Sequence, residues 1–172
     1  DWGKAVDDLS DKTGMSGEEA SKFLVLAKRT GMDLEKAQSI FGKFSKAVYT
    51  SADAMAKAAA EGKQSDDVLT RLGVSALNVD GSMRSTTQIF MDVKNKLVSM
   101  EDGWQKTALE MELFGKSGFE VHDILHMTNE EMEATIAKAQ KMGLIISSET
   151  AQAWEQFDRN MNSAKGTMTS LG

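Results

Sequence analysis

The chain has 172 residues, a mass of 18.7 kDa and a formal net charge of −6, from 20 Lys and Arg against 26 Asp and Glu. With 41% hydrophobic and 27% charged residues, its composition is typical of a globular protein and excludes a disordered or fibrous one. The absence of cysteine excludes disulfides, thiolate metal sites and thiol catalysis, and the absence of proline favours a mostly helical chain.

The charge pattern, the length of the apolar runs and the first residues limit the classes of protein to which the chain can belong. Basic residues are scattered among acidic ones in the sequence, so we expect no direct nucleic-acid binding. No apolar run approaches the ~20 residues of a membrane-spanning helix, and no secretory signal begins the chain. Because Asp1 is not a start methionine, we expect the chain to be part of a longer protein.

Two Thr-Gly-Met segments, 13–15 and 30–32, punctuate the N-terminal part of the chain. A glycine in the left-handed conformation commonly ends a helix, and the Ser or Asp that follows each segment is a preferred N-cap for the next one. Between and after these segments the apolar residues recur at helical spacing. The sequence predicts helices over 17–29 and 34–48, and an alanine-rich helix over 51–61.

The middle of the chain continues the pattern with one interruption. Gly73 and Gly143 predict two further helix ends, and three Ser/Thr-x-x-Glu/Gln capping boxes predict helix starts at Ser16, Ser85 and Thr128. The interruption is an Asp-Gly pair between short alternating residues, which predicts a small β-hairpin near 77–84. Helical periodicity returns over 86–100, 103–114, 119–127 and 129–142.

The last segment carries a narrow row of apolar residues in steps of three and four, typical of a coiled-coil seam. We regard this row as the candidate surface for a protein partner: Trp154, Phe157, Met161, Met168 and Leu171. Ala164 continues the same spacing. Two interpretations remain open, a terminal helix packed on the domain or a helix that leaves it towards a longer coiled coil.

These elements predict a mainly all-α fold of helical hairpins and short helices, with one small β-hairpin. We expect three segments: helical hairpins with an alanine-rich helix over 1–64, a compact helical subdomain with the β-hairpin over 65–146, and a C-terminal helix over 147–172. The stretch 61–65 is the predicted hinge between the first two.

The motifs that suggest chemistry have simpler structural explanations. His122 and His126 have the i, i+4 spacing of zinc-binding helices, but the glutamate beside the first histidine and a clear third ligand are missing. Adjacent acidic pairs such as Glu18-Glu19 occur at helix starts, where acidic side chains favour the helix dipole. Residues 114–118 contain one glycine before Lys-Ser, too few for a phosphate-binding loop. We expect no catalytic residue, no cofactor site and no metal site.

The ordered set of motifs resembles the conserved region of phage tail tape-measure proteins over about residues 9–160. The motifs are Leu72-Gly73-Val74, the Asp80-Gly81 turn, the helix start Arg84-Ser85-Thr86, the Met100–Gly103 turn and the corner Phe114-Gly115-Lys116-Ser117-Gly118. The paired Thr-Gly-Met helices and residues 142–147 are also similar to the family. Two departures are Glu101, where proline is common, and His122 with His126, where aliphatic or variable residues are usual.

The resemblance implies a structural virion protein rather than an enzyme. Tape-measure proteins are long helical proteins inside the phage tail tube, and their length sets the length of the tail during assembly. Expected partners are tail tube and tail assembly proteins, tail assembly chaperones and further copies of the same protein. The expected locations are the bacterial host cytoplasm during assembly and the lumen of the virion tail.

Two other functions remain alternatives. One is a helical protein-interaction (adaptor) domain of a non-phage protein. The other, less favoured, is a domain associated with murein hydrolysis, since some tape-measure proteins carry such activity elsewhere in their chain.

Overall fold

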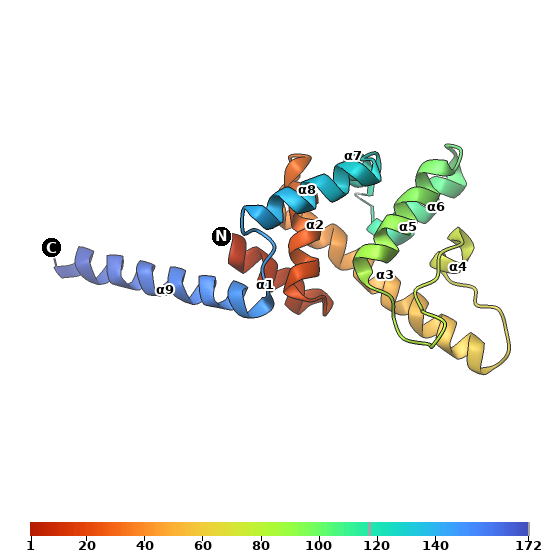
Figure 1. Cartoon of the computed structure of the whole chain (residues 1–172), viewed down its shortest axis with the longest axis horizontal. Helices are drawn as coiled ribbons and strands as arrows, with labels where there is room; N and C mark the ends of the chain where they lie inside the picture. The colour runs from red at the N-terminus through yellow and green to blue at the C-terminus, as the bar shows by residue number, and fades with distance from the viewer. Residues whose placement is uncertain (117, 172) are drawn as a thin grey trace.

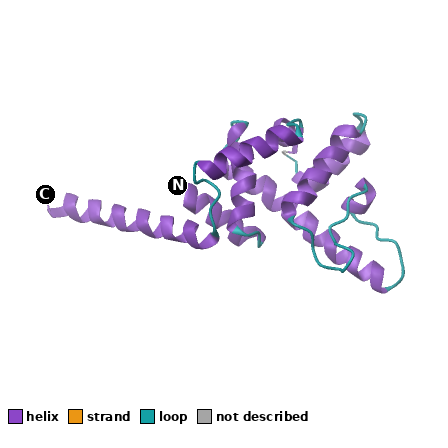
Figure 2. Ribbon diagram, viewed as in Figure 1, coloured by secondary structure: helices purple, strands orange, loops and turns teal. Residues whose placement is uncertain are grey.

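The computed structural model describes residues 1–116 and 118–171, with the side chains of 164–171 excepted. Helix dominates the described residues, and loops join the helices (Figure 2). The elements are α1 (Trp2–Thr13), α2 (Gly17–Arg29), α3 (Leu34–Ala60), α4 (Val68–Leu72), α5 (Thr86–Ser99), α6 (Trp104–Phe114), the 3-10 helix η1 (Gly118–Val121), α7 (His122–Leu125), α8 (Asn129–Lys141) and α9 (Ser148–Leu171). The predicted mainly helical fold is confirmed.

The glycine stops and the capping boxes are where the sequence predicts them. Gly14, Gly31, Gly73 and Gly143 have φ values of 76°, 81°, 85° and 76°, the left-handed conformation that ends a helix at low cost only for glycine. At the starts, the hydroxyls of Ser16, Ser85 and Thr128 accept hydrogen bonds from the backbone N–H groups three residues later. Local chemistry therefore sets most helix boundaries.

Several boundaries differ from the prediction. The helix predicted over 119–127 is divided into the 3-10 helix η1 and the four-residue α7. The separate helices expected over 34–48 and 51–61 form one continuous helix, α3, because no glycine or proline interrupts residues 49 and 50 and Ser51 is buried on the same helix. A further difference is α4, a five-residue helix whose end at Gly73 is predicted but whose start and short length are not. Its N-cap is Asp67, whose carboxylate accepts a hydrogen bond from the backbone N–H of Thr70.

The predicted β-hairpin near 77–84 is wrong. This segment contains only an isolated antiparallel bridge between Leu77 and Met83, and no strand occurs among the described residues. Asp80 organises the loop instead, because its carboxylate accepts hydrogen bonds from both the backbone N–H and the hydroxyl of Ser82. Val79 is fully exposed and Met83 only partly buried against the core, so little apolar area would reward longer strand pairing.

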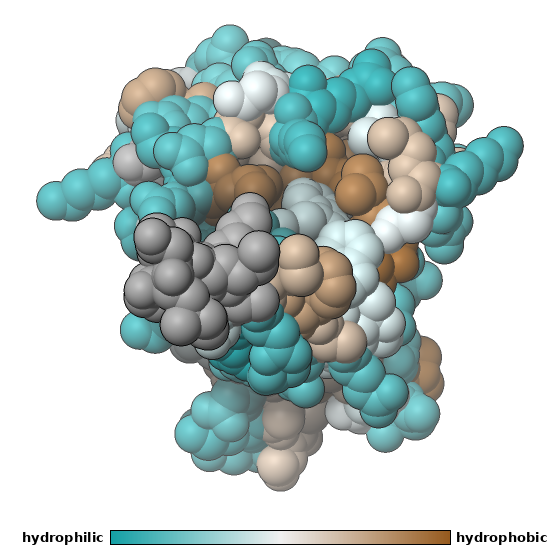
Figure 3. Space-filling view, turned by 90° about the vertical axis from the view of Figure 1, so that its left-hand side faces the viewer, coloured by the Kyte–Doolittle hydropathy of each residue, from teal (hydrophilic) through white to brown (hydrophobic). Residues whose placement is uncertain are grey.

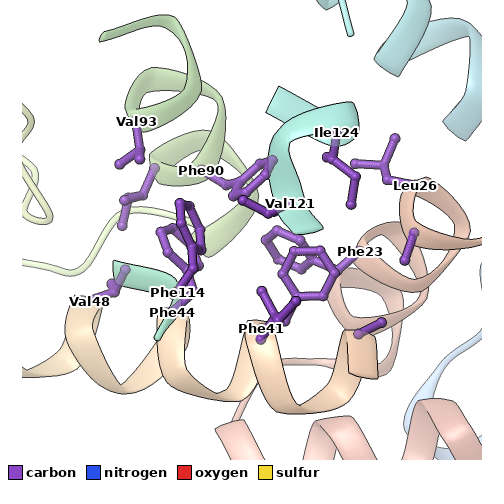
Figure 4. Close-up of a cluster of buried hydrophobic side chains, with 14 of the residues drawn as sticks. Phe23, Leu26, Phe41, Phe44, Val48, Phe90, Val93, Phe114, Val121 and Ile124 are labelled. Carbon is purple, nitrogen blue, oxygen red and sulfur yellow. The ribbon is translucent and has the colours of Figure 1, made fainter. Parts of the chain in front are cut away.

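The centre of the molecule is a cluster of five fully buried phenylalanines, which we call the phenylalanine cluster: Phe23, Phe41, Phe44, Phe90 and Phe114. These rings come from α2, α3, α5 and α6 and pack against one another beside the short η1–α7 segment (Figure 4). The Phe90 ring lies edge-on to the Phe23 and Phe44 rings, with centroid distances of 5.3 and 5.4 Å, a favourable aromatic geometry.

One connected apolar core includes residues from all three predicted segments, from Ala5 in α1 to Ala151 in α9. The division into 1–64, 65–146 and 147–172 stays a prediction about folding units. Beyond this core, α9 leaves the body and extends to one side (Figure 1). None of the described helices is both long enough and apolar enough to cross a lipid bilayer.

Candidate functional site

The beginning of α9 is held close to α1 by a glycine. Ala151 is fully buried there, and a Cβ atom on Gly3 would lie 2.6 Å from the Trp154 Cβ atom and 2.9 Å from the Ala151 carbonyl oxygen. Only a residue without a side chain fits at this distance. The first turns of α9 therefore dock on the body, as the packed-helix interpretation expects.

The segment that leads into α9 is fixed by polar contacts as well. The Trp2 indole N–H donates to the Leu144 carbonyl oxygen at 2.8 Å, and the Ile146 N–H donates to the Ser21 hydroxyl at 3.1 Å. The Gly17 N–H donates to the Ser148 hydroxyl, also at 3.1 Å. These bonds tie both ends of the α8–α9 connection to the two N-terminal helices, so the body sets the direction in which α9 projects.

The apolar row predicted for the last segment, which we call the α9 seam, begins at this junction and continues onto the exposed part of the helix. Trp154 is 39% exposed because it also contacts α1, whereas Phe157 is 64% and Met161 46% exposed. The side chains of Met168 and Leu171 lie outside the described residues. The view from the side towards which α9 projects shows hydrophobic residues in the middle of this face, with hydrophilic residues around them (Figure 3). A helix with three exposed large apolar side chains in a row is suited to contact with another helix.

Two acidic side chains meet at the α1–α9 junction. Asp7 of α1 is 9% exposed, and its Oδ1 atom has no hydrogen-bond donor. A side-chain hydrogen bond with Asp7, burial and the negative charges of Asp7 and Asp8 raise the pKa of Glu155 above its ordinary value, while Arg159 acts in the opposite direction. The junction therefore stabilises the protonated form of Glu155 more than an isolated, exposed position would.

The two histidines lie beside a buried glutamate rather than in a recognisable metal site. His122 Nε2 is 2.8 Å from the Glu110 carboxylate, and the His122 and His126 rings are 6.1 Å apart. Together with Lys106 and Asp102 they line a small hollow of about 160 Å³. A hydrogen bond from Lys106 and its charge lower the pKa of Asp102, and the two histidines act in the same direction. In the part of the chain that the structure describes, no three His, Asp or Glu side chains are placed to share a metal ion.

The other motifs have structural roles. Glu18, Glu19, Glu130 and Glu131 lie in the first turns of α2 and α8, where the helix dipole favours them. Glu19 also accepts a hydrogen bond from the Thr87 hydroxyl at 3.3 Å and so links α2 to α5. Gly115 ends α6 with a φ of 85°, and the Lys43 side chain lies against it. In the turn after α6, Ser117 lies outside the described residues.

Comparisons with protein-family models, with curated protein sequences and with solved structures found no match to this chain. A proposal about its function must therefore depend on the residues and contacts described above and on the motif resemblance.

Three features of the structure had no clear signal in the sequence. The acidic pair at the α1–α9 junction joins residues more than a hundred positions apart. The second feature is Lys94, which is 4% exposed and donates to Asn129 at the start of α8, and whose burial lowers its pKa. The third is a group of lysines gathered beside α3, described below. Each depends on long-range packing that periodicity does not reveal, although the i, i+3 spacing of Lys43 and Lys46 was visible.

Proposed function

We propose that this chain is a structural module of a phage or prophage tail tape-measure protein, with no catalytic role of its own. The observation that supports this most is the construction of α9, which is anchored by its first turns and then projects with Phe157 and Met161 exposed. A compact helical body that directs an apolar helix outwards is suited to join a rod of helices.

The mechanics of such a module follow from helix geometry. At a rise of 1.5 Å per residue, the 24 residues of α9 span roughly 36 Å. The contacts at Gly3 and Gly17 hold the first turns, so they would transmit the orientation of the body to the rod. The exposed seam would bind a second copy of the protein, tail tube and assembly proteins or a tail assembly chaperone. These partners place the chain in the host cytoplasm during assembly and in the tail lumen afterwards.

A murein-hydrolase function is less favoured by the contacts of the acidic residues. Hydrolysis of a glycosidic bond generally needs two carboxyl groups that face a cleft at ~5–10 Å. Here Glu110 is 2.8 Å from His122, and the adjacent acidic pairs of α2 and α8 lie in first turns. We expect the purified chain to leave peptidoglycan intact in a turbidity assay, and lysis would contradict the non-enzymatic assignment.

The decisive experiment measures tail length by electron microscopy of particles from the source strain. Whole heptads of helical sequence are inserted after Asn162 in the gene that encodes the chain. A ruler lengthens the tail by ~1.5 Å per inserted residue. The matched control inserts the same number of residues as a flexible loop between Gly62 and Lys63, outside any helix, and should leave tail length unchanged.

The same experiment separates the proposal from the adaptor alternative. Tails that keep their length in every heptad variant, or a strain whose particles do not contain this protein, would contradict the tape-measure function. The exposed seam of α9 would then be assigned to a helical adaptor domain of a non-phage protein, since that role needs the same surface but no link to tail length.

A further inference from the structure

A second surface, on the body rather than on α9, has the composition of a ligand site. The end of α1 and the middle of α3 border a hollow of about 480 Å³, which we call the lysine hollow. Three lysines and several hydroxyl groups line it, including Lys12, Lys43, Lys46, Ser39, Tyr49 and Thr50. No carboxylate lies among the residues that line it, although the chain as a whole carries a net charge of −6.

The helices bring these lysines together from distant parts of the sequence. Lys43 and Lys46 lie one turn apart on α3, and Lys12 reaches them from the last turn of α1. Gly42 makes room for this approach, because a Cβ atom there would lie 3.2 Å from the Lys12 Cε atom. No basic cluster is visible in the sequence, because the three lysines come together only when α1 packs against α3.

The three lysines differ from others on the same surface in having no acidic partner. Lys36 and Lys57, also on α3, form ion pairs with Glu120 and Asp53 at 2.8 and 3.0 Å. For Lys12, Lys43 and Lys46, no ion pair or side-chain hydrogen bond occurs within the described part of the chain. Three uncompensated positive charges around one hollow repel one another, and a bound anion would relieve that repulsion.

We propose that the lysine hollow binds a phosphate-bearing anion. Lysine ammonium groups and hydroxyls are donors that phosphate oxygens accept, and a volume of about 480 Å³ falls in the range of small-ligand sites. Tyr49 is 40% exposed at the edge and offers an aromatic face to a base. The ligand class is therefore a nucleoside phosphate, or the sugar-phosphate backbone of a single strand that presents the same chemistry.

A neighbouring hollow limits the extent of this surface. It has a volume of about 490 Å³, shares Lys43, Lys46 and Thr50 with the lysine hollow, and is also lined by Arg71 and three carboxylates, Asp66, Asp67 and Glu112. The Arg71 guanidinium is paired with Glu112 at 2.8 Å and Asp66 at 3.8 Å, so the unpaired positive charge is concentrated at the shared lysines. The carboxylates disfavour an anion there, so the phosphate groups are expected to stay in the lysine hollow. This inference is independent of the proposed role in the tail.

The test is a titration of the whole chain with ADP, with inorganic phosphate and with an eight-nucleotide oligothymidine, followed by calorimetry and amide chemical shifts. The double variant Lys43→Gln/Lys46→Gln should weaken binding by at least ~10-fold, since it removes two charge-assisted hydrogen bonds to phosphate oxygens. For the oligonucleotide, the slope of log K against log salt should fall by ~0.7 per lysine removed. The shifts should centre on residues 39–50 and 12–13.

The matched control is Lys57→Gln/Lys63→Gln, which removes the same charge from two exposed lysines that already have acidic partners. It should bind as the wild type does. If ADP binds and inorganic phosphate competes with it, the ligand is a free phosphate ester. If only the oligonucleotide binds, the ligand is a sugar-phosphate backbone. Either result supports the proposal. Absence of saturable binding, or an equal loss of affinity in both double variants, overturns the proposal.

A further variant, Ser39→Glu, introduces a carboxylate into the hollow and should also abolish binding. Thermal melts of every variant establish that it is folded.

Discussion

The phenylalanine cluster and the α1–α9 junction are both buried contacts between helices, yet they are built in different ways. The cluster is wholly apolar, and large rings from four helices fill its volume. The junction relies on the absence of a side chain at Gly3 of α1, with Gly17 of α2 allowing the same close approach at the first residue of α9, and contains an acidic pair, Asp7 and Glu155.

The difference indicates two separate tasks. Apolar packing contributes free energy in proportion to the area removed from water and is indifferent to pH, so the cluster is suited to hold the fold together. Close backbone contact and titratable groups contribute less free energy but fix the relative positions of the helices, so the junction is suited to orient α9. Substitutions in the two regions should separate loss of the fold from loss of α9 docking.

The largest effect is expected from Phe90→Ala. Phe90 is fully buried and contacts the rings of Phe23, Phe41, Phe44 and Phe114, so its removal leaves a cavity where several helices meet. Such truncations cost ~3–5 kcal/mol in the free energy of unfolding, measurable by urea denaturation. Phe119→Ala is the control: Phe119 is 68% exposed, and its loss should change stability by no more than ~0.5 kcal/mol. Similar losses of stability in both variants would contradict a core centred on the phenylalanine cluster.

A smaller effect, confined to the junction, is expected from Gly17→Ala. The new Cβ atom would meet the backbone of Ser147 and Ser148, with the Ser147 carbonyl carbon 2.5 Å away, and backbone cannot move aside as a flexible side chain can. Overpacking of this kind lowers the free energy of unfolding by ~1–3 kcal/mol. Hydrogen exchange should show faster exchange at the start of α9 while the amides around the phenylalanine cluster stay protected.

The matched control for Gly17→Ala is Gly42→Ala on α3. A Cβ atom at Gly42 would meet only the end of the Lys12 side chain at 3.2 Å, which can shift, and alanine has the higher helix propensity by ~1 kcal/mol. We therefore expect unchanged or higher stability. Loss of α9 protection in Gly42→Ala as well would mean that the effect at Gly17 is not local.

The comparison also shows what the sequence could predict. Helix boundaries followed from Gly14, Gly31, Gly73 and Gly143 and from the caps at Ser16, Ser85 and Thr128, because these signals act within a few residues. The hairpin prediction failed because the Asp80-Gly81 signal specifies a turn but not the neighbouring strands needed to extend it. The contacts of Gly3 with Trp154 and of Lys12 with α3 depend on packing of distant elements, which periodicity does not encode.

The acidic pair predicts a pH dependence that the phenylalanine cluster lacks. Contact with Asp7 and burial raise the pKa of Glu155 in the folded state. A raised pKa means that the stabilisation is complete below the ordinary pKa of glutamate and is lost as the pH rises through the raised value. Stability of the α1–α9 junction should therefore fall across that window, whereas Glu155→Gln should remove this fall because a side-chain amide does not ionise and stays uncharged beside Asp7 at any pH.

Melting temperatures at closely spaced pH values between 4 and 7 test the direction of this pH dependence. Glu149→Gln is the control, because it removes an exposed carboxylate from the first turn of the same helix without contact to Asp7. The control should keep the wild-type pH profile. A wild-type junction that becomes more stable as the pH rises through this window would contradict the protonated pair.

The smallest effect on stability, and the largest on assembly, is expected from Phe157→Gln. Phe157 is 64% exposed on α9 beyond the docked turns, so its replacement removes little buried area and should change the free energy of unfolding by no more than ~0.5 kcal/mol. If the α9 seam binds another helix, the same variant should reduce incorporation of the protein into tail particles.

Gln156→Ala, one residue earlier on the exposed surface of the helix, is the control and should assemble normally. Normal assembly of Phe157→Gln would remove the α9 seam from the proposed function while leaving the packing at Gly3 and Gly17 unchanged, which separates the docked and projecting parts of this helix.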